Sequence, residues 1–214
     1  MVNLNAPTMG TYGSTWQVRG FAGSGLVGDL IDCLQGRPVA VCGSATGVFW
    51  EMDIVRKRYG EDLVVFAVND VGMYLDRVDH WCSLHTENLK AWKAVRWLHH
   101  TGDDNIVYHG VDKGVAHNWQ SLTPLFALSG YFAMQIAYIM GAKRIILCGC
   151  SGDSRARFFE SQYRTGFGYG GGETQSDINI RQQLISEMNR LPAFKRKVRS
   201  MSGWTKSYFG REDD

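Results

Sequence analysis

The sequence predicts an α/β protein with a Rossmann-like fold, in which a mostly parallel sheet carries helices on both faces. Two observations lead to this prediction. Three short runs, "PVAVC" (38–42), "DLVVFAV" (62–68) and "RIILCGC" (144–150), are apolar at nearly every position. The segments between them repeat apolar residues at helical spacing. Strands buried on both faces that alternate with helices are typical of a parallel sheet.

The first predicted strand, Pro38–Cys42, leads into a helix predicted near residues 48–59. Three consecutive cations, residues 56–58, stand in its last turn and Gly60 follows them. Cations at that end complement the helix dipole, and glycine is a common helix stop. This strand and helix form the first half of a βαβ unit.

A second strand is predicted at Asp62–Val68 and a shorter third one at Val78–His85. A helix follows with Thr86 as its N-cap, because threonine oxygens accept bonds from the first helical amides. Its predicted apolar stripe consists of Leu89, Trp92, Val95, Trp97 and Leu98. The run "NIVYHG" (105–110) predicts another strand.

The clearest unit is "SGYFAMQIAYIMGAKRIILCGC" (129–150), in which Ser129 is expected to cap a helix that is apolar nearly all round. Gly141 ends this helix and a strand follows. Beyond it lies a long glycine-rich loop with several arginines and tyrosines. A loop of that length in a compact domain is usually either functional or disordered. A last helix is predicted at Ile178–Leu191.

Three regions are expected: an irregular N-terminal arm (1–36), a Rossmann-like domain (37–191) and a basic C-terminal tail (192–214). With 214 residues, of which 44% are hydrophobic, the chain can bury one core. The net charge of +2 gives no general attraction to nucleic acid. The cations near the C-terminus leave a nucleic-acid or other acidic partner open, although a solvated surface is the usual interpretation.

The five cysteines form no C-x-x-C pair and have apolar neighbours, which favours reduced thiols in the cytoplasm. The longest apolar stretch has ten residues, too few to span a bilayer, so no membrane association is expected. No metal site is expected either, because the histidines and Cys82 fit no zinc spacing. Cys148 and Cys150 are expected on one face of a strand.

Ligands of open α/β sheets bind outside the carboxyl ends of the strands. This rule selects five places in the sequence: Gly43–Gly47, Asn69–Asp70, Ser83–His85, Gly110–Asp112 and Gly149–Asp153.

The first of these places is a turn of small residues, Gly43, Ser44, Ala45 and Thr46, at the start of a helix. Unpaired amides and the helix dipole favour an anion there, so the turn is a candidate phosphate site. It matches neither G-x-G-x-x-G nor the Walker A pattern, and a tight corner is the alternative.

Two further places strengthen the case for a nucleotide. Ser129 and Gly130 open the buried helix and offer a second N-terminus to an anion or a ribose hydroxyl. Asn69 and Asp70 follow a strand, where a base or sugar would be bound. An Asx-type turn is the alternative for this pair.

Histidine is the usual acid–base residue. His85 and His109 stand near predicted strand ends, and we expect His85 to be the general base with His109 as second choice. On the long loop, Arg155, Arg157 and Tyr163 could close over a phosphate. A surface loop or a subunit contact is the alternative.

The segments "VAVCGSATGVF", "VFAVND", "VDHWCSLH" and "SGYFAMQIAYIMGAKRIILCGCSGD" resemble a Rossmann-like group. It comprises the family 42 sialyltransferases, the motility accessory factor proteins and the 6-hydroxymethylpterin pyrophosphokinase-like domains. The likeness covers about residues 37–153. It implies that Gly43–Thr46, Asn69, Ser129–Gly130 and Cys148–Asp153 surround a nucleotide, as a cytidine nucleotide is surrounded in the sialyltransferases.

Two departures from that group are visible. The strand that ends in G-x-D in the group ends here in Gly149-Cys150-Ser151-Gly152-Asp153, so Asp153 is a candidate for the catalytic aspartate. The sialyltransferase histidine lies beyond that strand, whereas this chain has no histidine after His117. The sialyltransferase mechanism therefore does not carry over intact.

The leading hypothesis is a nucleotide-dependent transferase that moves a glycosyl or phosphoryl group to a small or glycan acceptor. Its donor would be a nucleoside diphosphate or a nucleotide sugar, with no further cofactor. The alternative is a non-catalytic Rossmann-like module in a multimeric assembly, such as a homo-oligomer in a bacteriophage particle or its packaging machinery.

Overall fold

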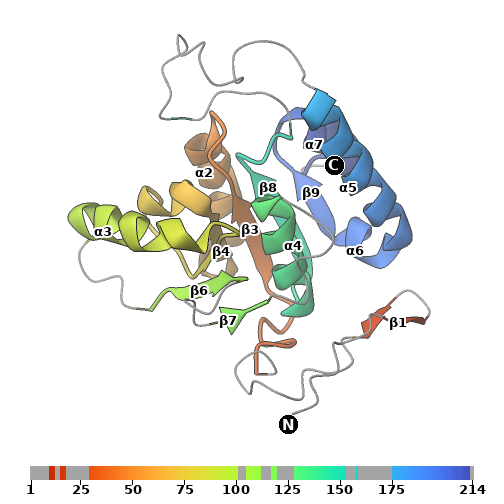
Figure 1. Cartoon of the computed structure of the whole chain (residues 1–214), viewed down its shortest axis with the longest axis horizontal. Coiled ribbons are helices and arrows are strands. Elements are labelled where there is room, and N and C mark those ends of the chain that lie inside the picture. Colours follow the sequence, from red (N-terminus) through yellow and green to blue (C-terminus); the bar gives the residue numbers. More distant parts are fainter. Residues whose placement is uncertain are drawn as a thin grey trace.

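The computed structural model of the chain describes residues 10–12, 15–17, 29–100, 105–111, 117–119, 128–152, 158 and 175–212 (Figure 1). Four predicted site residues lie outside these ranges: Asp153, Arg155, Arg157 and Tyr163. Most of the predicted N-terminal arm and glycine-rich loop lies outside them as well. The structure therefore bears on the corners of the sheet and not on the predicted lid.

Seven strands of the described residues form one parallel sheet in the order β7-β6-β5-β4-β3-β8-β9. This arrangement confirms the predicted α/β class. The strands are β3 (Pro38–Cys42), β4 (Val64–Val68), β5 (His80–Cys82), β6 (Val107–Gly110), β7 (His117–Asn118), β8 (Arg144–Cys148) and β9 (Val198–Ser200). A separate antiparallel pair consists of β1 (Gly10–Tyr12) and β2 (Thr15–Gln17).

The helices cover both faces of this sheet (Figure 1). They are α2 (Val48–Tyr59), α3 (Leu89–His99), α4 (Ser129–Ile139), α5 (Gln175–Arg190), α6 (Pro192–Lys197) and α7 (Gly203–Phe209). Single 3₁₀ turns lie at Gly60–Asp62, Asn69–Met73 and Thr86–Asn88.

Alternation along the central strand separates two cores. Val39 and Val41 of β3 pack with α4, α5 and α7 on one face of the sheet. Ala40 and Cys42 pack with α2 and the start of α3 on the other face. Because successive strand side chains point to opposite faces, a strand that is apolar at every position serves both cores.

The strand order reverses at β3, which is the topological switch point of the sheet. β3 pairs with β4 on one side and with β8 on the other. Gly43 and Gly149 meet just beyond the carboxyl ends of β3 and β8. A Cβ on Gly43 would lie 2.5 Å from the Gly149 carbonyl oxygen, and Gly149 has a φ of +61°. Only glycine fits such a contact without displacing backbone.

The region predicted as a basic tail belongs to the domain. Residues 192–212 contain α6, β9 and α7, and β9 pairs with β8 through Ile145 and Val198. The prediction of a separate tail is therefore wrong. β9 has three residues with cations around it, and its strand conformation depends on pairing with a distant strand that local sequence does not reveal.

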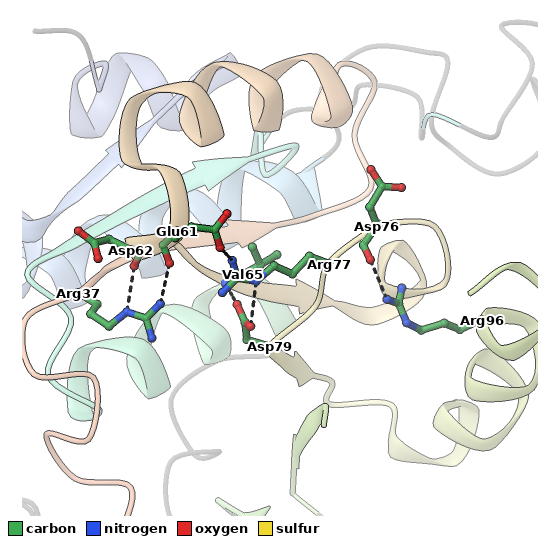
Figure 2. A network of polar contacts seen from close by, with 8 residues as sticks. All are labelled: Arg37, Glu61, Asp62, Val65, Asp76, Arg77, Asp79 and Arg96. Atoms are coloured by element: carbon green, nitrogen blue, oxygen red, sulfur yellow. Dashed lines mark hydrogen bonds and ion pairs between the residues drawn. The ribbon is translucent and has the colours of Figure 1, made fainter. Parts of the chain in front are cut away.

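The predicted stripe of α3 is partly wrong. Trp97 and Leu98 are 71% and 73% exposed, whereas Arg96 of the same turn is buried. The Arg96 guanidinium donates to the carbonyl oxygens of Gly72 (2.7 Å), Leu75 and Asp76, of which Figure 2 shows the last. Because Arg96 supplies hydrogen-bond donors to the carbonyl oxygens of that loop, this face of α3 is directed toward the interior in place of Trp97 and Leu98.

The start of α3 also differs from the prediction. Thr86 opens a 3₁₀ turn, and the N-cap of α3 is Asn88, which makes no side-chain capping bond.

Figure 2 shows a second polar cluster, in which Asp79 accepts from the Val65 amide at 2.8 Å and from Arg77 at 3.1 Å. This cluster fixes the segment that leads into β5.

Glu212 anchors the C-terminal segment to α2 and β8. Its buried carboxylate accepts a hydrogen bond from Tyr59 and lies 3.9 Å from Arg58 and 3.7 Å from Arg144. Burial, together with the hydrogen bond to Glu212, raises the pKa of Tyr59 to about 12. The tyrosine therefore stays a donor at neutral pH.

The Glu212→Gln variant should unfold about 1–2 kcal/mol more easily than the wild type, because the amide removes the charge that both arginines face. Partial exposure of the arginines keeps the effect below that of a fully buried pair. Urea unfolding measures the difference. Glu87→Gln, at an exposed carboxylate, is the control. Equal stability of both variants would contradict the anchor.

Candidate functional site

A cavity of about 320 Å³ lies at the switch point, beyond the carboxyl ends of β3, β4 and β8. Residues from these strand ends and from α4, α5 and α7 form its wall. They are Gly43, Ser44, Val68, Asn69, Leu128, Ser129, Gly130, Tyr131, Met134, Leu147, Cys150, Gly152, Ile180, Arg181, Leu184, Trp204 and Thr205. Open α/β sheets bind their ligands at this position, and the volume is within the range of small-molecule sites.

The cavity brings together five of the predicted site residues, which come from three separate corners. Gly43, Ser44, Asn69, Ser129 and Gly130 all line it.

The remaining members of two corners do not line the cavity. Ala45 and Asp70 are buried, and Thr46 is exposed. The corner after β3 therefore contributes Gly43 and Ser44 to the cavity wall, and the corner after β4 contributes Asn69.

The Gly43 corner uses its own amides to join β3 to β8. The Gly43 amide donates to Cys148 O at 2.8 Å, and the Ala45 amide donates to Gly149 O at 3.0 Å. Glu51, in the first turn of α2, is 2% exposed and accepts from the Gly149 amide at 2.7 Å. This carboxylate already neutralises the positive end of the dipole of that helix. This geometry favours the tight-corner interpretation of the turn over a phosphate site.

The N-terminus of α4 is more open. Its N-cap residue, Leu128, makes no side-chain capping bond, and the first bond within the helix runs from the Phe132 amide to Leu128 O at 3.0 Å. The amides of Ser129 and Gly130 therefore have no acceptor within the helix. Both residues line the cavity. This helix end can bind an anion.

Ser129 is the first helical residue and not the N-cap, so that prediction is wrong. Its Oγ instead accepts from the Leu84 amide at 3.4 Å and joins α4 to the end of β5.

Asn69 has a left-handed backbone, with φ at +56°. Its carbonyl oxygen accepts from Trp81 Nε1 at 2.6 Å, and its Oδ1 accepts from Ser83 Oγ at 2.8 Å. Ser83 Oγ in turn accepts from the His85 amide at 2.8 Å, so its hydroxyl proton is directed to Asn69. This chain orients the Asn69 amide group, whose Nδ2 is the donor left for the cavity. The predicted Asx turn is replaced by a contact to Ser83.

Arg181 of α5 is a site residue that the sequence analysis did not identify. It lines the cavity, its Nε donates to Gly152 O at 2.7 Å, and its guanidinium lies 5.3 Å from the Trp204 ring centroid. Trp204 stacks in parallel on Tyr208, with 5.3 Å between centroids. A usable signal was the position of Arg181 between Ile180 and Leu184, on the inner face of an amphipathic helix.

His109 is part of the core and is not in the cavity wall. It is fully buried, and its Nδ1 accepts from Trp119 Nε1 at 3.0 Å. Its Nε2 lies 2.9 Å from His80 Nδ1. Burial holds the pKa of His109 well below the usual value. The structure therefore contradicts its prediction as a second general base.

His85 has an exposed side chain, whose Nδ1 lies 3.5 Å from Glu87 Oε1. It does not line the cavity, but the preceding amide, that of Leu84, contacts Ser129. The imidazole therefore belongs to the surface near the start of α4.

The described cysteines are free thiols. Cys148 packs on the α2 face and Cys150 against the α4 face, because the left-handed Gly149 interrupts the strand alternation. The prediction of one shared face is wrong. A hydrogen bond with Cys42 and burial raise the pKa of Cys148, and burial raises that of Cys150.

Among the described residues, no group of three His, Cys, Asp or Glu side chains is placed to hold a metal ion.

The chain was compared with protein-family models, curated proteins and solved structures, and none of the three comparisons found a match. Within the described ranges, every helix is too short or too polar to cross a bilayer.

Proposed function

We propose that the cavity at the switch point binds a nucleoside diphosphate or a nucleotide sugar, and that the chain is a nucleotide-dependent transferase. The observation that carries this proposal is the convergence of three donor groups on one cavity. They are the amides at the start of α4, the Asn69 side chain and the Arg181 guanidinium. All three suit negatively charged oxygens.

The charge of the cavity supports an anionic ligand. Arg181 is a cation, and the described lining residues include no aspartate or glutamate. The Glu51 carboxylate, in the first turn of α2, accepts from the Gly149 amide. The charge of the lining therefore favours a phosphate beside Arg181.

The lining of the cavity also suits an apolar or aromatic group. Met134, Leu184 and Trp204 line it from α4, α5 and α7. A nucleobase is a flat ring that gains from contact with such side chains. The resemblance of these corners to the family 42 sialyltransferases points to the same class of ligand.

Transfer from a nucleotide donor needs mainly positioning and stabilisation of the leaving phosphate. In this proposal, the α4 amides and Arg181 hold the phosphate. His85 remains the candidate base, although its imidazole is not part of the cavity wall. The predicted roles of Asp153, Arg155, Arg157 and Tyr163 are part of the proposal.

Isothermal titration with cytidine, uridine, guanosine and adenosine diphosphates tests the binding step. We expect at least one of them to bind with a dissociation constant below about 1 mM, the weak end of specific small-ligand affinity. Absence of heat from all four, with the folded state verified by circular dichroism, would defeat the proposal.

The Arg181→Gln and Asn69→Ala variants should each weaken nucleotide binding by about tenfold, as expected for a lost charge-assisted or neutral hydrogen bond. Arg190→Gln is the matched control, because Arg190 lies on the same helix and pairs with Glu187 outside the cavity. Titration of the three variants with the best nucleotide measures the effect. Equal loss in Arg181→Gln and Arg190→Gln would contradict the role of Arg181 and point to an effect on α5 as a whole.

A second candidate function is the non-catalytic assembly module. The observation that favours it is the exposure of Trp50, Trp97 and Leu98 on α2 and α3, since large exposed apolar side chains are often interface residues. Multi-angle light scattering of the purified chain distinguishes the two candidates. A large, uniform oligomer that shows no nucleotide binding would favour the assembly module.

A further inference from the structure

A second hollow lies between the end of α5, α6, the start of β9 and the end of α7. Its volume is about 330 Å³, and it shares no lining residue with the nucleotide cavity. Figure 1 shows α5, α6 and β9 next to one another. We call it the basic groove; it is lined by Met188, Asn189, Pro192, Lys195, Arg196, Arg199 and Phe209.

The groove lies in the most basic part of the sequence. Residues 190–211 contain no aspartate or glutamate and hold seven of the 23 lysines and arginines of the chain. Because the net charge of the whole chain is only +2, the rest of the molecule is on balance acidic. The charge of the protein is therefore asymmetric, with the positive side at the groove.

The three cations of the groove lack acidic partners among the described residues. Of the acidic side chains nearby, Glu187 pairs with Arg190 at 3.1 Å, and Glu212 pairs with Arg58 and Arg144. Lys195, Arg196 and Arg199 thus keep their positive charge for a ligand.

Two of these cations are held in place by their surroundings. Arg199 donates to the carbonyl oxygens of Val198 (2.7 Å) and Arg196 (3.2 Å). The Lys195 ammonium lies 4.1 Å from the ring centroid of Tyr208. Some of these cations have a structural role, because α5, α6 and α7 all end near the groove and a cation stabilises the C-terminus of a helix. Arg199 belongs to β9, but its bond to Arg196 O places its charge at the last turn of α6, so it complements that helix end as well.

We infer that the basic groove binds the phosphate backbone of a single-stranded nucleic acid. The inference is independent of the proposed nucleotide transfer. A phosphodiester chain presents regularly spaced negative charges, which three cations along a groove can neutralise. The apolar floor of Met188, Pro192 and Phe209 offers contact to sugars and bases. The bases of a single strand are free to reach this floor, whereas those of a duplex are paired in its interior.

Fluorescence anisotropy with a labelled oligothymidylate of about 15 nucleotides tests the inference, a length within the range of single-strand binding sites. We expect binding at about 20 mM salt, with a log–log salt slope near −2 for roughly three phosphate contacts on a single strand. An oligonucleotide that leaves the anisotropy unchanged at this salt overturns the inference.

The Lys195→Gln, Arg196→Gln, Arg199→Gln triple variant should bind at least about tenfold more weakly, with a salt slope near zero. The matched control neutralises three exposed lysines elsewhere, Lys57, Lys90 and Lys143, and should keep its affinity within about twofold. Equal weakening in both variants overturns the inference, because it assigns the binding to net charge.

Two further arms keep the test decisive. If the triple variant fails to fold, the exposed Arg196→Gln variant alone should lower the magnitude of the slope by about 0.7. Vesicles of phosphatidylserine and an oligoglutamate peptide are the competing polyanions. If either of them binds more tightly than the oligonucleotide, and the triple variant loses that binding, the assignment to nucleic acid is overturned.

Discussion

The Gly149→Ala variant should lose about 3 kcal/mol of stability or more. The added Cβ would overlap the Gly43 carbonyl oxygen and lie 2.7 Å from Val48 Cβ. It would also force a non-glycine residue to adopt a φ of +61°. Steric overlap and backbone strain therefore add up at the point where β3 meets β8. Chemical unfolding of the purified variant measures the loss.

Gly36→Ala is the control that separates these two contributions. Gly36 has a φ of +80°, and an added Cβ there meets nothing within 4 Å. This variant should lose only about 1 kcal/mol, the cost of a left-handed backbone alone. If both variants lost the same amount, the close contact of Gly43 with Gly149 would have no energetic role.

The protein should lose about 3 kcal/mol of stability between pH 6.5 and pH 4 through His80 alone. Burial lowers the pKa of His80 from 6.5 to about 4, an effect that Asp79 opposes and that His117 and Arg37 increase. The unfolded chain takes up its proton first as the pH falls. The stabilisation is therefore complete above pH 6.5 and decreases on acidification. The buried His109, whose pKa is also low, acts in the same direction.

Urea unfolding at several pH values between 7.5 and 4.5 measures this dependence. His80→Gln, which keeps an acceptor for His109, should flatten the curve above about pH 5, where few carboxylates titrate. His85→Gln, at an exposed imidazole, should leave the curve unchanged. A wild-type curve that is flat down to pH 5 would rule out a buried neutral histidine pair.

The central part of the fold was predictable because its signals are local. The strands β3, β4 and β8 are apolar at nearly every residue, and the buried helix α4 ends at a glycine, as its sequence indicates. β9 and α7 were not predicted, because their conformation depends on β8 and on the anchor at Glu212. Distant pairing of this kind leaves no periodic pattern in a short segment.

The candidate site was predictable to a similar extent. The rule that ligands bind beyond the carboxyl ends of strands selected Gly43 and Asn69, and the start of the buried helix added Ser129; all three line one cavity. It could not show that the amides of the Gly43 corner are engaged with β8, because those bonds join residues about 100 positions apart. Arg181 was not identified because cations on amphipathic helices usually face solvent, although its place between Ile180 and Leu184 indicated the inner face.

The most direct test of the central claim is a crystal structure of the chain soaked with the nucleotide that binds best. We predict density for a phosphate within hydrogen-bond distance of the Ser129 and Gly130 amides, with Asn69 and Arg181 beside it. A nucleotide bound elsewhere on the protein, with this cavity empty at saturating concentration, would contradict the account.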